Sequence, residues 1–220
     1  MFGAPEMVAV SASGMQRNEI QGLLQRLPVL NSLQLPDSLF NELSPVSSPA
    51  GILAIANIPA SKMQPEKSQF GVLLEDIQDT GNLGSILRSA AAAGADCAFL
   101  SKDCAFAWSP KTLRAAMGAH FKLPIFENSD LSAVVRHFNG KIIATDPDAK
   151  KTLYETDCCG PVAFIFGNEG AGVSPSLLKS ADERVMIPMP GKMESLNTAA
   201  AAAICLFEKI RQEKTNANRN

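Results

Sequence analysis

The chain has 220 residues, 46% of them hydrophobic, which is enough for one α/β domain of ordinary size and a small appendage. Its formal net charge of −2 at pH 7 excludes a global excess of positive charge, although a local basic patch for nucleic acid remains compatible with this value. Five cysteines without a CxxC pair and two histidines argue against a disulfide scaffold and against a bound metal. No secretory signal and no run of about 18 apolar residues is present, so we expect a cytoplasmic protein without a membrane segment.

Residues 1–68 differ from the rest of the chain. They hold the proline-rich cluster SPVSSPAG and two short mixed segments, EIQGLLQRL and ILAIANI, which predict one or two helices and a strand. The polar stretch SKMQPEKSQ, residues 61–69, is typical of a linker. We therefore expect a small accessory region over residues 1–68 and a main domain over residues 69–220.

From Phe70 onward, short apolar runs alternate with segments of helical periodicity. Expected strands are 70–77, 97–100, 122–126, 141–146, 162–166 and 184–188, and expected helices are 82–93, 109–119, 129–138, 174–181 and 195–214. Gly94 is a plausible helix stop, Ser109 an N-cap before Pro110, and Ser195 a second N-cap. Strands without period-two alternation, separated by helices, predict an α/β fold with a parallel sheet covered on both faces.

Three polar or glycine-rich clusters follow expected strands: EDIQDTGNLGSILRSA, FGNEGAGVS and IPMPGKMESLNTA. Ligands of open parallel sheets bind at the carboxyl ends of the strands, so these clusters are the candidate site. The glycine loop is neither a Walker A loop nor a dinucleotide fingerprint. It is either a plain turn or a backbone cradle for a polar ligand, in which Glu169 accepts from a cation or a helix N-terminus.

The other two clusters also have two readings each. Asn82 is a plain N-cap or a functional amide, and Arg88, six residues later, is a solvated side chain or a fork of donors for phosphate. Ser195 and Asn197 are caps of the last helix or site residues. The five alanines after Thr198 leave little bulk, which favours close packing of another helix or subunit.

Taken in this order, the segments DTGNLGSILRSA, FIFGNEGAGVS and IPMPGKMESLNTAAA resemble the three motifs of the SpoU-type (TrmH-like) family of RNA ribose 2′-O-methyltransferases, within the SPOUT superfamily. The resemblance covers roughly residues 70–212. The part before it corresponds in placement to a small RNA-binding domain of many relatives, in a shortened form.

The resemblance implies a parallel-sheet α/β knot, in which the C-terminal segment forms a trefoil knot that holds S-adenosylmethionine. It also implies a homodimer, rRNA or tRNA as substrate, and chemistry without a metal. The residues that match the cofactor-binding positions are Thr145, Gly167, Ile187, Met189 and Leu196. The residues that match the catalytic positions are Asn82, Arg88, Glu169, Ser195 and Asn197.

Arg88 has two possible roles under this resemblance. The family's usual proposal makes it the base for the ribose 2′-hydroxyl, but free arginine keeps its proton to above about pH 12. We favour a role in positioning the adjacent phosphate and stabilising the 2′-oxyanion. A local basic stripe is expected to contact RNA phosphates: Lys62, Lys67, Arg88, Lys102, Lys111, Arg114 and Lys122.

Two other functions compete with this one. A non-catalytic RNA-binding or assembly protein on the same scaffold has no need of Arg88, Glu169, Ser195 and Asn197. A plain nucleotide-binding α/β protein lacks its phosphate loop here. The sequence therefore favours a methyltransferase.

Overall fold

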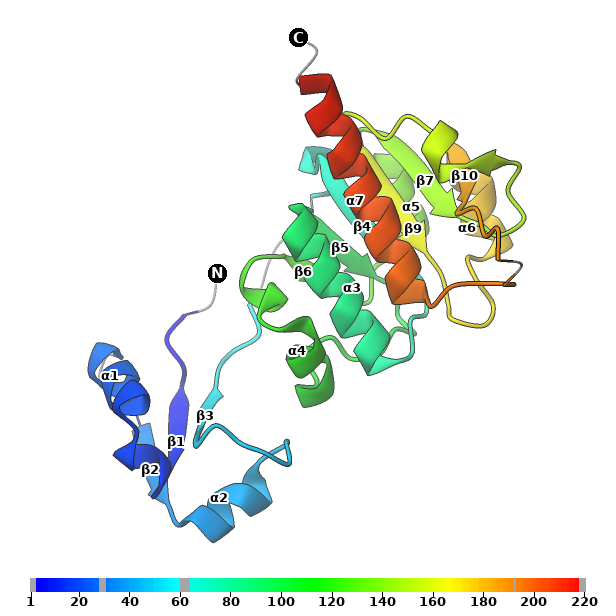
Figure 1. Cartoon of the computed structure of the whole chain (residues 1–220). Helices are drawn as coiled ribbons and strands as arrows, with labels where there is room; N and C mark the ends of the chain where they lie inside the picture. Colours follow the sequence, from blue (N-terminus) through cyan, green and yellow to red (C-terminus); the bar gives the residue numbers. More distant parts are fainter. Residues whose placement is uncertain (1–2, 28–30, 60–63, 192, 218–220) are drawn as a thin grey trace. The chain divides into compact units, whose positions relative to one another are not determined.

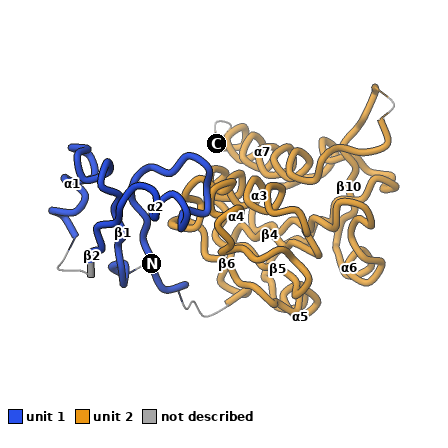
Figure 2. Tube along the Cα trace, turned by 90° about the horizontal axis from the view of Figure 1, so that it is seen from below, with its two compact units in different colours: residues 1–60 blue, residues 61–220 orange. Residues whose placement is uncertain are grey.

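The computed structural model describes residues 3–27, 31–59, 64–191 and 193–217. The chain forms two compact units, residues 1–60 and 61–220, coloured separately in Figure 2. In these described segments, no helix is both long and apolar enough to cross a membrane.

The first unit is a three-stranded sheet with two helices. Its strands, in the order β2-β1-β3, are Asn31–Leu35, Met7–Ser11 and Ile52–Ile55; β2 is parallel and β3 antiparallel to β1. Its helices are α1, Asn18–Arg26, and α2, Asp37–Leu43, and the short turn η1, Gly14–Gln16, precedes α1. The sequence predicted one strand here, and β1 and β2 were missed because a five-residue run leaves little periodicity to detect. Val8, Val10, Ile20 and Phe40 form the small buried core.

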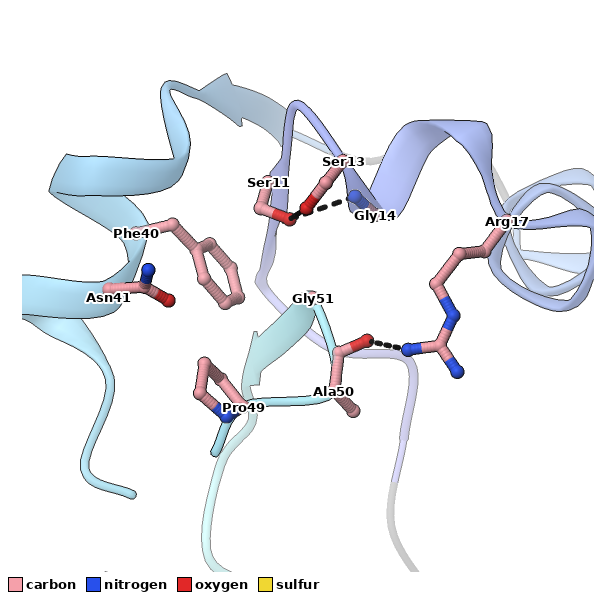
Figure 3. Close-up of a pocket in the computed structure, with 9 residues that line it drawn as sticks. All are labelled: Ser11, Ser13, Gly14, Arg17, Phe40, Asn41, Pro49, Ala50 and Gly51. Carbon is pink, nitrogen blue, oxygen red and sulfur yellow. Dashed lines mark hydrogen bonds between the residues drawn. The ribbon is translucent and has the colours of Figure 1, made fainter. Parts of the chain in front are cut away.

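A small pocket lies between β1, η1, α2 and the residues just before β3 (Figure 3). Ser11 Oγ accepts from the Gly14 N–H at 2.9 Å, and Arg17 Nη1 donates to the Ala50 carbonyl at 2.7 Å. A Cβ on Gly14 would lie 2.4 Å from the Gly51 carbonyl oxygen, so this junction requires glycine. The pocket's volume of about 80 Å³ holds a few water molecules, and the contacts serve the packing of the unit itself.

The second unit contains a seven-stranded, fully parallel sheet in the order β6-β5-β4-β9-β7-β10-β8 (Figure 1). This confirms the predicted α/β class. The strands are Phe70–Leu74 (β4), Cys97–Leu100 (β5), Ile125–Phe126 (β6), Lys141–Thr145 (β7), Lys151–Thr152 (β8), Val162–Phe166 (β9) and Glu183–Met186 (β10). The two-residue β8 was missed from the sequence.

Helices cover both faces of this sheet, as predicted. On one face, α3 and α7 lie side by side with α4 next to α3; on the other face, α5 and α6 pack against β5, β7 and β9 (Figure 1). The helices are Thr80–Ala93 (α3), Pro110–Ala116 (α4), Leu131–His137 (α5), Pro175–Ser180 (α6) and Thr198–Ala217 (α7). The short turns η2, Pro65–Lys67, η3, Ala119–Phe121, and η4, Leu153–Glu155, complete the unit.

The helix ends confirm some predictions and correct others. Ser109 caps α4, and Gly94 ends α3 in the left-handed conformation, with φ of 80°. Asn82 is not an N-cap, because α3 begins earlier: the Asp79 carboxylate accepts from the Asn82 N–H at 2.7 Å. Ser195 is not an N-cap either, because Asn197 takes that role at the start of α7.

In the sequence, Leu196, Ile204, Phe207 and Ile210 recur at roughly helical spacing and predict the apolar side of the last helix, but the buried face of α7 differs from this prediction. Ile204 and Ile210 are partly buried, whereas Phe207 is 48% exposed. The residues that enter the core are Ala202, Cys205 and Leu206. Small alanines let α7 lie close to α3 and the sheet, and this close approach decides which face of the helix is buried.

Candidate active site

The carboxyl ends of β7, β9 and β10 open into a pocket of about 350 Å³. Its lining comes from four segments, 145–148, 167–173, 185–189 and 195–201, and from Leu178 of α6. All five residues proposed from the sequence to contact a cofactor line this pocket: Thr145, Gly167, Ile187, Met189 and Leu196. Of the five proposed catalytic residues, Glu169 and Ser195 line it.

The glycine loop after β9 is closed by contacts of its own backbone. A Cβ on Gly167 would lie 2.1 Å from the Gly172 carbonyl carbon and 2.3 Å from the Val173 nitrogen, so no other residue fits. Gly172 has φ of 71°, and its N–H donates to the Asn168 carbonyl at 2.9 Å. A Cβ on Gly170 would meet just one atom within 4 Å, the Asn168 Oδ1 at 3.6 Å. The glycines at 167 and 172 are therefore required by the loop itself.

Asn168 holds this loop and was missed from the sequence. Its Oδ1 accepts from the N–H groups of Gly170 (2.9 Å) and Ala171 (3.0 Å), and its Nδ2 donates to the Asp76 carbonyl at 2.8 Å. An asparagine just before a glycine turn was the available signal, since its side chain often bonds the backbone two residues on. The bond to Asp76 ties the second motif to the first.

Three proposed catalytic residues form one chain of side-chain hydrogen bonds. Asn82 Nδ2 donates to Glu169 Oε1 at 3.0 Å, and Asn197 Nδ2 donates to Asn82 Oδ1 at 2.8 Å. Asn197 Oδ1 then accepts from the Ala199 N–H (2.9 Å) and the Ala200 N–H (3.2 Å) at the start of α7. A carboxylate can only accept, so Glu169 determines the orientation of the Asn82 amide, and Asn82 that of Asn197.

Glu169 also accepts from the backbone at the start of α3. The Gln78 and Asp79 N–H groups donate to its two oxygens at 3.3 and 3.2 Å. Desolvation alone would raise the pKa of Glu169, but the hydrogen bonds from Asn82 and from backbone N–H groups outweigh it and lower that pKa. Glu169 is therefore ionised at neutral pH, next to a helix N-terminus that favours negative charge.

Arg88 and Ser195 lie outside this hydrogen-bonded chain. Both are exposed, and within the described residues neither makes a hydrogen bond or ion pair. Arg88 is six residues after Asn82 on α3, about 9 Å further along the axis and on a different face. The series of hydrogen bonds thus joins Asn82, Glu169 and Asn197 and does not include Arg88.

The expected basic stripe is exposed where the structure describes it. Lys67, Arg88, Lys102, Lys111, Arg114 and Lys122 are all exposed, while Lys62 lies outside the described residues. Lys111, Arg114 and Lys122 belong to or follow α4 and η3.

Comparison with known proteins identifies the family of the chain that carries this site. The model of the SpoU rRNA Methylase family matches residues 69–207, which include all three motifs and the whole pocket. The chain belongs to the SpoU rRNA methylase family. A tRNA/rRNA methyltransferase of Synechocystis sp., whose function is uncharacterised, is 38% identical over 170 residues, 76% of this chain and 62% of that protein. The 23S rRNA (guanosine(2553)-2′-O)-methyltransferase of Bacillus subtilis is 34% identical over 175 residues, 79% of this chain and 70% of that protein.

Solved structures of SpoU family members share the fold. The SpoU methyltransferase AviRb from Streptomyces viridochromogenes, in complex with AdoMet, superposes with a TM-score of 0.86 and 27% identity, over 96% of this chain and 84% of that chain. The match to the Synechocystis protein covers 62% of that protein, and a match to mitochondrial rRNA methyltransferase 3A of Danio rerio covers 51% of it. The chain thus spans less than two thirds of either relative.

Proposed function

We propose that this chain is an S-adenosylmethionine-dependent RNA methyltransferase that modifies a ribose 2′-hydroxyl of rRNA or tRNA. The observation that carries the proposal is the hydrogen-bonded chain from Glu169 through Asn82 to Asn197 beside the pocket. A non-catalytic binder has no need of such an arrangement. The Bacillus subtilis relative, named a 2′-O-methyltransferase of 23S rRNA, supports the same reaction.

The pocket suits S-adenosylmethionine in size and lining. Its volume of about 350 Å³ lies in the ~300–1,000 Å³ range of small-molecule sites. Ile187, Met189 and Leu196 offer apolar contact, and the loop from Gly167 to Gly172 offers backbone N–H and C=O groups to a polar ligand. The cofactor of the AviRb structure supports this assignment. When bound, the cofactor supplies a methyl group made electrophilic by its sulfonium.

The residues of this chain then orient the RNA and stabilise charge. Asn82 uses one N–H of its amide on Glu169, so the second N–H is available to a ribose or phosphate oxygen. Arg88 holds the phosphate next to the reacting ribose and stabilises the negative charge that develops on the 2′-oxygen, since arginine keeps its proton under ordinary conditions. The 2′-hydroxyl proton is released to solvent water as the methyl group is transferred to the oxygen. We assign Ser195 as a donor to the same nucleotide, and its exposure among the residues that line the pocket supports this role.

Labelled methyl transfer from S-adenosylmethionine into unmodified total RNA, followed by alkaline hydrolysis, tests the reaction. A 2′-O-methyl group blocks cleavage of the neighbouring phosphodiester, so label in dinucleotides establishes ribose methylation and label in mononucleotides contradicts it. No transfer despite measurable cofactor binding favours a non-catalytic RNA-binding protein. Arg88→Lys is the variant to compare: near-normal turnover would exclude the bidentate phosphate role.

We also propose that the chain acts as a homodimer and that its C-terminal segment forms a trefoil knot. Arg88 makes no contact with the Glu169 network within one chain, as expected if a second copy completes each site. The exposed Phe207 on α7 is suited to such an interface. The knot is supported by the placement of the loops after β9 and β10 around one pocket, and by the similarity to AviRb.

The remaining assignments concern the first unit and the compartment. We propose that residues 1–68 form a shortened RNA-recognition region and linker, before a methyltransferase domain over residues 69–220. We place the reaction in the cytoplasm, which agrees with five cysteines that are all free thiols.

A further inference from the structure

A surface of the second unit, residues 61–220, combines apolar and basic side chains. It is formed by α4, η3 and the turn before α4, and we name it the α4–η3 surface. Its members are Phe106, Lys111, Arg114, Met117, Phe121 and Lys122. We propose that this surface binds unpaired nucleotides of the RNA substrate, with bases on the apolar side chains and phosphates on the basic ones. This inference rests on the proposed function, because it takes RNA as the partner.

The apolar members are exposed to an unusual degree. Phe106 is 55%, Met117 68% and Phe121 69% exposed, within a stretch of 16 residues. Isolated exposed apolar residues are normal, but three large ones carried by the adjoining elements α4 and η3 and the turn before α4 favour an interaction site. Aromatic side chains are the usual platforms on which single-stranded bases stack, with little preference for sequence.

The charge of the same segment is complementary to RNA. Residues 104–126 contain no aspartate or glutamate, and they carry Lys111, Arg114 and Lys122 in a chain whose net charge is −2. All three cations are exposed. Basic side chains interleaved with aromatic ones provide both contacts that a single strand needs, phosphate pairing and stacking.

Two hydrogen bonds hold the framework of this surface. Thr112 Oγ1 donates to the Phe106 carbonyl at 3.0 Å, which fixes the turn before α4 on the helix. His120 Nε2 donates to the Ala107 carbonyl at 2.8 Å, which fixes η3 beside the same turn. Phe106 and Phe121 therefore lie on either side of a junction that these two hydrogen bonds hold in place, and RNA binding requires little further ordering of the backbone.

The α4–η3 surface is continuous with the helix that carries Arg88. A Cβ on Gly84 would lie 2.5 Å from the Ala115 Cβ and 2.7 Å from the Thr112 carbonyl oxygen, so α3 and α4 are in direct contact there. Arg88 is one turn after Gly84 on the same face of α3. An RNA strand bound on the α4–η3 surface can thus continue toward Arg88, the residue proposed to hold the phosphate next to the reacting ribose.

The same features disfavour a duplex and a second copy of the chain as the occupant. In a duplex the base faces are stacked on one another and cannot cover Phe106 or Phe121. A two-fold interface built on this surface would bring Lys111, Arg114 and Lys122 close to their own copies. Unpaired RNA can stack its bases on the aromatic members and bring its phosphates to the basic members.

Fluorescence anisotropy of the full chain with a labelled single strand of about 12 nucleotides tests the inference, because one such binding module covers ~4–16 nucleotides. Phe106→Ala and Phe121→Ala are each expected to weaken single-strand binding by roughly tenfold. The matched control is Tyr154→Ala, an aromatic residue 56% exposed in η4, which should leave binding unchanged. A duplex of the same sequence should bind more weakly and should not respond to either phenylalanine variant.

Salt dependence separates phosphate contacts from stacking. Removing Lys111, Arg114 and Lys122 together should reduce the slope of log K against log salt by about 2, at ~0.7 per phosphate contact. The phenylalanine variants should lower affinity without changing this slope. An unchanged slope in the triple variant, or wild-type affinity in both phenylalanine variants, would overturn the inference.

Two further outcomes distinguish this inference from others. If sedimentation shows that Phe121→Ala dissociates a wild-type dimer while RNA affinity per chain is unchanged, the surface joins copies of the chain and the inference is wrong. If the expected binding pattern appears but no RNA is methylated, the proposed function fails and the α4–η3 surface still stands as an RNA-binding site.

Discussion

The hydrogen-bonded chain through Glu169, Asn82 and Asn197 predicts an unusual double-mutant result. In Glu169→Gln, one of the two carboxylate oxygens becomes an NH₂. The Gln78 N–H donates to Oε2, whereas the Asp79 N–H and the Asn82 amide both donate to Oε1, so the new side chain keeps most of its bonds with its oxygen at the Oε1 position. The Gln78 N–H then faces the new NH₂ and loses its acceptor, while the hydrogen bond from Asn197 to Asn82 is kept.

The cost of this single change follows from the groups that lose partners. A hydrogen bond to a charged group contributes about 1.5–3 kcal/mol when buried, but Glu169 is more than a third exposed, so water reduces that amount. We expect Glu169→Gln to lower the free energy of unfolding by about 1 kcal/mol, or roughly 2–4 °C in Tm for a unit of this size.

Asn197→Asp is the second member of the cycle. Alone it keeps an acceptor for the start of α7 but loses the donor to Asn82, so a cost of about 1 kcal/mol is expected. Combined with Glu169→Gln, it allows the whole chain to reverse direction: the new amide at position 169 donates to Asn82, and Asn82 donates to the new carboxylate at position 197. The total charge is unchanged, and a carboxylate at the N-terminus of α7 is favourable.

The double variant is therefore expected to be more stable than the sum of the single effects by about 1 kcal/mol, within the 0.5–3 kcal/mol seen for directly coupled residues. Urea unfolding followed by tryptophan fluorescence measures this, because Trp108, the one tryptophan of the chain, lies in the second unit, which also holds all three residues. Additivity within about 0.3–0.5 kcal/mol would refute the reasoning. Methyl transfer by the double variant then tells whether Glu169 acts through order alone or through its charge.

Two other predictions concern the pocket loop and a buried histidine. Gly167→Ala should abolish S-adenosylmethionine binding in calorimetry, because its Cβ would lie 2.1 Å from the Gly172 carbonyl carbon, whereas Gly170→Ala should bind as the wild type does. Burial lowers the pKa of His120, so below about pH 6.5 the unfolded chain binds a proton more readily than the folded one. Stability should fall as the pH drops from 7 toward 5, and His120→Gln should flatten this slope in urea unfolding.

The main helices and strands of the second unit were predictable because their signals are local. VAFIF has the length and composition of a buried strand, and Ser109 before Pro110 marks a helix start. The three motifs were recognisable because their spacing survives in the sequence. Strands β1 and β2 were too short to detect, and they become strands by pairing with partners elsewhere in the chain.

Competition between neighbouring polar residues explains the two wrong N-caps. Asp79, Asn82, Ser195 and Asn197 are all acceptable capping residues, and a local pattern does not rank them. Contacts from outside each helix determine which of these residues caps it. Asn82 is directed to Glu169 and Asn197 to Asn82, which leaves Asp79 and Asn197 as the caps.

By itself, the sequence determined the α/β class, the order of the motifs and the residue types of the site, because periodicity, turn chemistry and spacing act over a few residues. Only the tertiary structure decided which of these residues meet. Asn82 is separated from Glu169 by 87 residues and from Asn197 by 115, and they come together because parallel strands end at one edge of the sheet. The tertiary structure also decided that Arg88 is not part of the hydrogen-bonded network, because the neighbours of a helical side chain depend on how the helix packs.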